Sequence, residues 1–91
     1  MEFKIRFETS IDGVPYFIHH SKSVSKEKFL REWIQGEGFA KVIKDSFDDR
    51  KGITIKELSY KIDRPRSFTV EFTDVRGKVF KGEVEYFAVR H

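Results

Sequence analysis

Apolar and charged residues alternate one by one at the start of this chain, and a period of two is typical of a β-strand. Phe3, Ile5 and Phe7 are separated from one another by single charged residues. Because successive side chains of a strand point to opposite faces of a sheet, this spacing places all three on one face. The sequence therefore predicts a strand over residues 2–9 with one face buried and the other in solvent.

A tight turn and a second strand follow the first one. Asp12 and Gly13 form the pair favoured in two-residue hairpin turns, where the backbone needs positive φ angles. Apolar residues return over residues 14–20, which we interpret as a second strand. Pro15 has no N–H to donate to a neighbouring strand, so it belongs at the start of its strand or on an open edge of the sheet.

The spacing of apolar residues changes to that of a helix in the middle of the chain. Four of them fall on one helical face, opposite charged and amide side chains: Phe29, Leu30, Trp33 and Ile34. Ser23 or Ser25 would begin this helix, because a serine hydroxyl accepts a hydrogen bond from a free N–H of the first turn. Since Trp33 lies within the apolar stripe, we expect it in the core rather than at a contact surface.

The glycines Gly36 and Gly38 predict the end of that helix, because glycine readily takes the left-handed conformation at a helix C-terminus. A second, short helix is expected over residues 39–47, followed by a polar turn that begins with Asp48 and Asp49. Acidic side chains at a helix C-terminus oppose the helix dipole, and this interpretation therefore places both aspartates beyond the helix.

The last third of the chain returns to strand patterns. Three strands are predicted, over residues 53–62, 68–73 and 79–89, separated by turns at residues 64–67 and 74–78. The first of these strands changes the phase of its alternation near residues 56–57. One inserted bulge residue would produce that change, so we expect a bulge there.

These elements predict an α+β fold in the order β-β-α-α-β-β-β. A chain of 91 residues forms one small domain, so we treat residues 1–91 as a single unit. Helices between two sets of hairpin-linked strands pack best as a largely antiparallel five-stranded sheet with one or two helices on one face. A β-grasp-like arrangement, with two strands, a helix and then further strands, is one option.

The sequence contains none of the residue patterns that carry familiar chemistry. It has no cysteine, which excludes disulfides and thiolate metal sites. His19 and His20 are adjacent, so on a strand they point to opposite faces, and His91 is far from both in sequence. No Gly-x-Ser-x-Gly, calcium-loop or phosphate-loop motif is present. We therefore expect a protein without enzymatic activity, cofactor or bound metal.

Nothing in the sequence directs the chain to a membrane or out of the cell. No apolar run approaches the roughly 18 residues of a membrane span, and the N-terminus does not resemble a signal peptide. We expect a soluble protein of the cytoplasm that has no membrane partner.

Basic residues exceed acidic ones by 18 to 15, but the two signs are interleaved along the chain. Five cations in or near the last turns are candidates for contact with phosphates or an acidic partner: Arg64, Arg66, Arg76, Lys78 and Lys81. The two turns lie at opposite ends of one predicted strand, about 27 Å apart for about eight residues at roughly 3.4 Å each. The turns can bracket a long ligand, but they cannot hold a single phosphate together.

Several aromatic residues are left over once one face of the sheet is filled. With helices on one face only, alternation places Phe17, Phe87 and Val89 on the opposite, open face. Exposed aromatic patches commonly mark protein interfaces, so these three residues are the candidate apolar binding surface. The alternative is that the sheet curls or a chain segment covers them, which would make them part of the core.

Two functions remain open on these grounds. The first is a protein-binding module, such as a small regulator, inhibitor or adaptor of a larger intracellular complex. The second is single-stranded or duplex nucleic-acid binding, with the basic turns on phosphates and the sheet-face aromatics stacked on bases. A homodimer through the open face or through an edge strand is compatible with either function.

Overall fold

A computed structural model describes residues 1–89, with residue 63 described by its backbone alone. Within that range the elements follow in the predicted order: β1 (Glu2–Ile11), β2 (Val14–Ser23), α1 (Glu27–Gln35), α2 (Glu37–Lys51), β3 (Ile55–Arg64), β4 (Ser67–Asp74) and β5 (Val79–Ala88). The strands form one five-stranded sheet in the order β2-β1-β5-β4-β3, and every pair of neighbours is antiparallel. The α+β fold expected from the sequence is confirmed.

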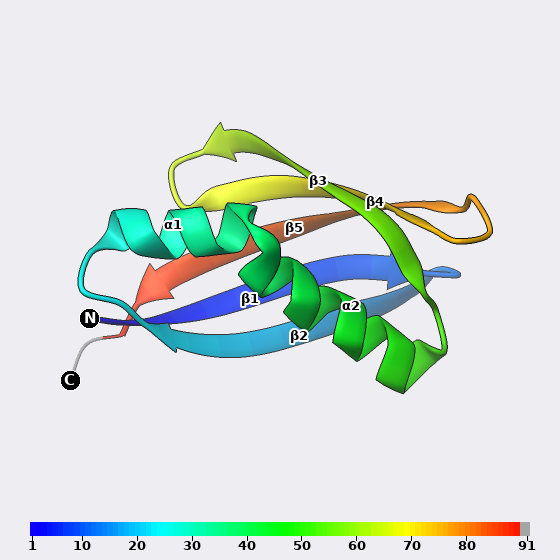
Figure 1. Ribbon diagram of the computed structural model, residues 1–91, viewed down its shortest axis with the longest axis horizontal. Coiled ribbons are helices and arrows are strands. Elements are labelled where there is room, and N and C mark those ends of the chain that lie inside the picture. Colours follow the sequence, from blue (N-terminus) through cyan, green and yellow to red (C-terminus); the bar gives the residue numbers. More distant parts are fainter. Residues whose placement is uncertain (90–91) are drawn as a thin grey trace.

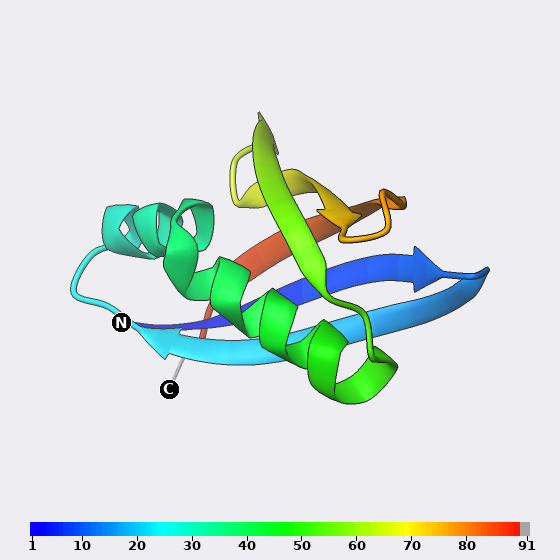
Figure 2. The same cartoon turned by 45° about the vertical axis from the view of Figure 1, so that its right-hand side comes forward.

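The two helices lie on one face of the sheet and connect its two outer strands (Figures 1 and 2). The chain leaves the sheet at β2, crosses the face through α1 and α2, and re-enters at β3 on the far edge. The order of the elements is the one described for the β-grasp-like option. In this sheet β5 pairs antiparallel with β1. Because α1 and α2 lie end to end, the helical layer is only one helix wide (Figure 1).

The core lies between the covered face of the sheet and the inner sides of both helices. Seven of the ten phenylalanines are buried. The ring of Phe47 from α2 is central, with centroids 5.0–6.3 Å from those of Phe7, Tyr16, Phe72 and Phe80. Each large apolar side chain removed from water contributes roughly 1.5–3 kcal/mol to folding. The aromatic residues therefore hold the helices on this face.

The predicted turn between the first two strands is confirmed. Asp12 and Gly13 have φ angles of 52° and 80°, the positive values that a tight hairpin turn requires. Both strands are ten residues long, longer than predicted, because their pairing continues from the turn as far as Ser23. Pro15 lies near the start of β2, which is an edge strand, as its missing N–H requires.

The start of α1 differs from the prediction. Its N-cap is Lys26, and no side chain caps the first turn. Ser23 belongs to β2 instead, where it pairs with β1, and Ser25 lies before the N-cap. The pairing of β2 with β1 thus includes Ser23, one of the two serines predicted to begin the helix.

The glycines between the helices also act differently from the prediction. Gly36 separates α1 from α2 with a φ of −93°, so it does not take the left-handed conformation. Gly38 lies within α2, and a β-carbon there would overlap the indole ring of Trp33. Trp33 itself is half-buried and packs against the core, as expected from its place in the apolar stripe. The second glycine thus makes room for a large ring rather than ending a helix.

The second helix is longer than predicted and ends at Lys51. Asp48 and Asp49, expected beyond the helix, lie inside it. The helix ends at Gly52, which takes a φ of 63° and donates its N–H to the Asp48 carbonyl at 3.1 Å. Arg50 and Lys51 in the last turn interact favourably with the helix dipole and offset the two acids.

The register of β3 against β4 shifts twice, between Ile55 and Glu57 and again between Ile62 and Arg64. The first shift is the bulge predicted from the change of phase in the sequence. Together the two shifts confine regular pairing to the segment 57–62, and bulges of this kind increase the local twist of a strand. Accordingly, β3 turns steeply away from the direction of the other strands (Figure 2).

Candidate protein-binding surface

The sequence predicts three exposed apolar residues on the face opposite the helices, and one of them is exposed as expected. Phe87 is 53% exposed. Phe17 is only half-buried rather than open, because the Arg6 guanidinium lies 5.0 Å from its ring centroid and the His19 ring stacks beside it. Val89 is also half-buried, and its N–H donates to the backbone of β1. Neighbouring side chains and backbone therefore cover part of the predicted surface.

Phe17 and Phe87 do not form a continuous apolar patch. On the intervening strand β1, Phe17 lies opposite Glu8 and Phe87 lies opposite Lys4. Those two β1 positions are four residues apart in the register, which is about 14 Å along a strand. Arg6 lies between them. The open face therefore alternates between apolar and charged groups.

Charges of both signs occupy the middle of the open face. Glu8 lies opposite Glu83 across β1 and β5, and Arg6 lies opposite Glu85 one row further along. Directly opposed carboxylates repel one another, and the ion pair between Arg6 and Glu8 at 3.3 Å offsets part of that repulsion. Such a mixture is typical of a solvated face rather than of an apolar interface.

The five candidate cations do not converge on one site. Arg64 and Arg66 lie at the turn between β3 and β4, whereas Arg76 and Lys78 lie at the turn between β4 and β5 (Figure 1). These turns are at opposite ends of β4, as the sequence predicts. Lys81 lies on β5 opposite Glu71. The structure therefore offers no single phosphate site built from these residues.

Two of these cations already have acidic partners within the chain. The Arg66 Nε lies 2.6 Å from a carboxylate oxygen of Glu27 on α1. The Lys78 ammonium lies 2.8 Å from the Asp12 carboxylate, and the hydrogen bond and charge of Lys78 lower the pKa of Asp12. Binding of a phosphate to either cation would have to compete with these ion pairs.

A different apolar row lies on the helix-side face of the edge strand β3. Leu58, Tyr60 and Ile62 pair with buried residues of β4 and therefore point to the covered face of the sheet. The helical layer is too narrow to cover them fully. Ile62 is 54% exposed, and Leu58 and Tyr60 are half-buried. These three residues are hereafter the β3 row.

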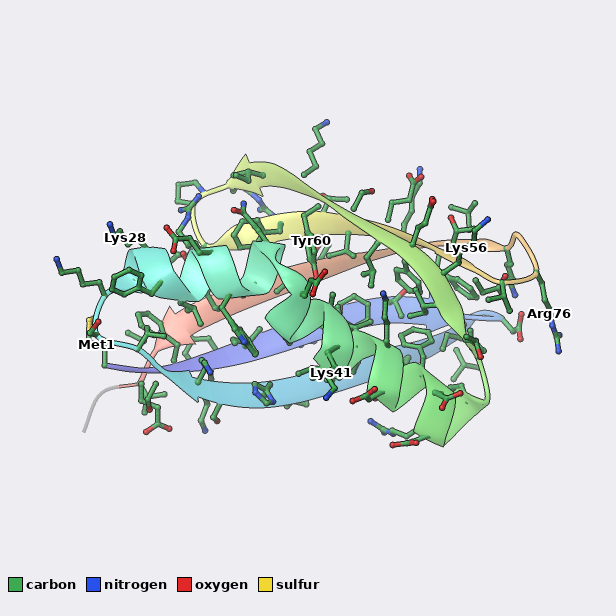
Figure 3. All side chains as sticks on the ribbon, viewed as in Figure 1. Met1, Lys28, Lys41, Lys56, Tyr60 and Arg76 are labelled. Carbon is green, nitrogen blue, oxygen red and sulfur yellow. The ribbon has the colours of Figure 1, made fainter. Side chains whose placement is uncertain are left out.

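A groove of about 910 Å³ lies between the β3 row and α2. One wall consists of the junction of the helices and the first half of α2, including Gly36, Ala40 and Lys44, and the other consists of β3. Tyr60 projects from β3 toward this part of α2 (Figure 3). The groove is thus lined by the apolar β3 row together with polar and charged side chains of both walls.

The hydroxyl group of Tyr60 is the one polar group inside this row. Its oxygen is shielded from solvent and has no hydrogen-bond partner. Burial raises the pKa of Tyr60 to about 12, so the phenol is neutral and retains its proton under ordinary conditions. A buried hydroxyl without a partner costs about 1–3 kcal/mol, so this group lowers the stability of the fold.

The two edges of the sheet differ in their protection against further strands. At the edge formed by β2, Pro15 removes one donor, and Arg50 of α2 donates to the Phe17 carbonyl at 3.5 Å. Arg50 and Lys51 also lie over the ring of Tyr16. At the other edge β3 contains no proline, and its protection consists of the bulges at its two ends and the exposed lysines Lys56 and Lys61. The regular segment between the bulges is the more open edge.

Sequence reasoning missed the β3 row as a candidate surface. The alternation of Leu58, Tyr60 and Ile62 correctly predicts a strand with one apolar face, and that face does point toward the helices. Its exposure depends on the strand order and on the width of the helical layer, which alternation alone does not determine. The alternation therefore carries no signal that this row is exposed.

Two further features of the described residues bear on function. Neither helix has the length and apolar character that crossing a membrane requires. No three histidines or carboxylates among the described side chains converge where they would hold a metal ion, and His91 lies outside the described residues. Comparisons with protein-family models, with curated proteins and with solved structures found no match for this chain.

Proposed function

We propose that this protein is a non-enzymatic protein-binding module, such as a small regulator, inhibitor or adaptor, and that it binds an extended segment along β3. The observation that carries the proposal is an incompletely covered apolar row on an edge strand. Ile62 is more than half exposed on the helix side, where the sheet is otherwise covered. β3 has β4 as its strand neighbour on one side, so its other side is the outer edge of the sheet.

Binding would combine the backbone of β3 with the groove beside it. An added strand supplies main-chain hydrogen bonds to the edge, and alternate side chains of that strand then point into the groove. An apolar side chain packed over Tyr60 and Ile62 contributes roughly 1.5–3 kcal/mol.

The charges around the groove indicate which segments fit. Glu37 and Lys44 lie on the side of α2, and Lys56 and Glu57 lie on the side of β3. With Lys61 of β3 and Glu71 of β4, the lining of the groove contains three acidic and three basic residues. This balance favours a segment of low net charge with apolar residues at alternate positions, rather than a strongly acidic or basic peptide.

Selection from a displayed library of random decapeptides tests the proposal. The immobilised protein should enrich peptides in which apolar residues alternate with polar ones. Ile62→Asp should weaken binding of a selected peptide at least tenfold, because it places a charge in the apolar β3 row. Val14→Asp is the matched control, since Val14 is 58% exposed and lies on β2, at the opposite edge of the sheet from the groove.

Two outcomes would contradict this function. Peptides that bind Ile62→Asp as tightly as the unmodified protein would exclude the groove. If the Phe87→Asp variant lost peptide binding while the Ile62→Asp variant kept it, the interface would lie on the open face, as the aromatic pattern of the sequence predicts. Melting temperatures of all variants distinguish lost binding from lost folding.

Nucleic-acid binding is the alternative, and its support is weaker. A hollow of about 580 Å³ on the open face includes Phe87, Lys4, Arg6 and His19, groups that suit stacking and phosphate contact. The nearby carboxylates of the same face oppose a polyanion. Fluorescence anisotropy with a labelled single-stranded oligonucleotide at increasing salt tests it: a steep loss of affinity with salt supports nucleic-acid binding, and no binding at low salt excludes it.

A further inference from the structure

We propose that the strand added to β3 is β3 of a second copy, and that the two strands pair antiparallel about a two-fold axis at Ser59. The inference rests on the proposed function, because it needs β3 as the binding edge, and it names the partner. In this register Glu57 of each copy lies opposite Lys61 of the other. Leu58 of each copy lies opposite Tyr60 of the other.

The geometry of antiparallel pairing limits the registers that β3 can adopt with itself. In an antiparallel pair, two directly opposite residues either both point their N–H and C=O groups toward the partner strand or both point them away from it. Along one strand these two orientations alternate from residue to residue, so opposite residues must be an even number of positions apart in the shared numbering. The two-fold axis must therefore pass through a residue position. The bulges confine regular structure to the segment 57–62, whose centre lies between Ser59 and Tyr60. An axis at Lys61 would set that lysine opposite its own copy, a pair of like charges, which leaves axes at Leu58, Ser59 and Tyr60.

Charge complementarity selects one of these three registers. An axis at Tyr60 sets Ser59 opposite Lys61 and forms no cross-strand ion pair within the regular segment. An axis at Leu58 sets Glu57 opposite Ser59 and forms no cross-strand ion pair. The axis at Ser59 sets Glu57 opposite Lys61 twice, once on each side of the axis, and opposite charges in this position stabilise a strand pair.

The same register also joins the apolar surfaces. Residues directly opposite one another share a face, so Leu58 and Tyr60 of both copies lie together on the helix side of the joined sheet. The helices of both copies then lie on the same face of a continuous sheet. The two grooves become one trough whose floor consists of two β3 rows, and this arrangement covers the open edge of each copy.

Charge reversal tests the register. Glu57→Lys and Lys61→Glu should each weaken self-association at least tenfold in sedimentation velocity, because each variant sets like charges opposite one another. An equimolar mixture of the two variants should restore association, since each supplies the charges that the other lacks. The double variant Glu57→Lys/Lys61→Glu should also associate. Glu32→Lys on the exposed side of α1 is the control and should leave association unchanged.

Cross-linking gives a second, independent measurement. The chain has no cysteine, so Ser59→Cys introduces a single thiol. In the proposed register the two Ser59 β-carbons are about 4.5–5.5 Å apart, whereas in either neighbouring register they are diagonal, at about 7–8 Å. Mild oxidation should therefore give a disulfide-linked dimer with Ser59→Cys. Ser10→Cys, exposed on β1, should not.

The outcomes separate this inference from the function it rests on. A chain that stays monomeric at all concentrations yet binds decapeptides in an Ile62-dependent manner would overturn the dimer and leave the function in place. A dimer that resists both charge reversals and is broken by Phe87→Asp would overturn the register and the edge. If Ile62→Asp changed neither self-association nor peptide binding, both proposals would be wrong.

Discussion

The indole ring of Trp33 lies directly against Gly38, so the backbone of α2 supports a side chain from the end of α1. The same ring stacks on His20 of β2, with centroids 5.4 Å apart, and the ammonium group of Lys22 lies 4.9 Å from its centroid. The junction of the helices is thereby fixed to the edge strand β2. A larger residue at position 38 would displace the ring from all of these contacts.

Gly38→Ala is therefore expected to destabilise the fold by about 1–2 kcal/mol, although alanine is the better helix former by about 1 kcal/mol. Urea unfolding measures the change, and the fluorescence of the only tryptophan reports the displaced ring. In a Trp33→Phe background, where the ring is smaller, Gly38→Ala should become neutral or stabilising. A destabilisation of equal size in both backgrounds would show that the indole is not the obstacle.

Gly82→Ala should be more harmful than Gly38→Ala. A β-carbon at Gly82 would lie 2.6 Å from the Glu8 carbonyl oxygen and 3.0 Å from the Phe7 ring, and a backbone atom cannot move aside as a side chain can. We expect a loss of about 2–3 kcal/mol by denaturant unfolding, with faster amide hydrogen exchange in β1 and β5. Unchanged exchange across this strand pair would contradict the close approach.

The raised pKa of Tyr60 predicts a loss of stability in alkaline solution. Burial raises its pKa to about 12, whereas a tyrosine in an unfolded chain ionises near pH 10. Between those values the unfolded chain gives up a proton that the folded chain keeps. The contribution of Tyr60 is therefore complete below about pH 10 and is lost as the pH rises toward about 12.

Urea unfolding at about pH 9 and about pH 11 measures this effect in the wild type and in Tyr60→Phe. The drop in unfolding free energy between the two conditions should be smaller for Tyr60→Phe. Burial also raises the pKa of Tyr86, so some loss remains in the variant. An identical drop in both proteins would mean that the Tyr60 hydroxyl is in contact with solvent.

Substitutions on the open face should separate the two aromatic residues that the sequence pattern treats alike. Phe87→Asp should change the unfolding free energy by less than about 0.5 kcal/mol, because Phe87 is more than half exposed. Phe17→Asp should cost about 1–2 kcal/mol, because it removes a half-buried ring that lies under Arg6. Thermal unfolding of both variants is the measurement, and equal losses would contradict the difference in burial.

Local patterns predict most of this fold because they depend on neighbours in sequence. The Asp12–Gly13 turn and the first bulge of β3 follow from residue types and a change of phase, and both are present. Because Asp48 and Asp49 oppose the helix dipole, the sequence predicts an end of α2 before them, whereas the helix continues to Lys51. The left-handed stop at Gly52 and the cations just before it decide the boundary instead.

The binding surface was harder to predict because exposure depends on distant parts of the chain. Alternation places Phe17 on the open face correctly, but Arg6, which covers it, comes from the neighbouring strand. Similarly, Ile62 lies on the covered face and is still exposed, because the helices do not reach the β3 edge. Period-two patterns assign a residue to a face of the sheet, whereas strand order and layer width determine what covers it.

The pairing of β1 with β5 has a consequence for how the chain acquires its structure. These adjacent strands come from opposite ends of the described sequence, whereas the β1–β2 hairpin and the β3–β4–β5 meander each involve only nearby residues. Both of those units can form early, and their docking has to wait until both are complete. Folding is therefore expected to be limited by this single long-range closure. During synthesis on the ribosome, β1 stays unpaired along its inner side until the last strand has emerged.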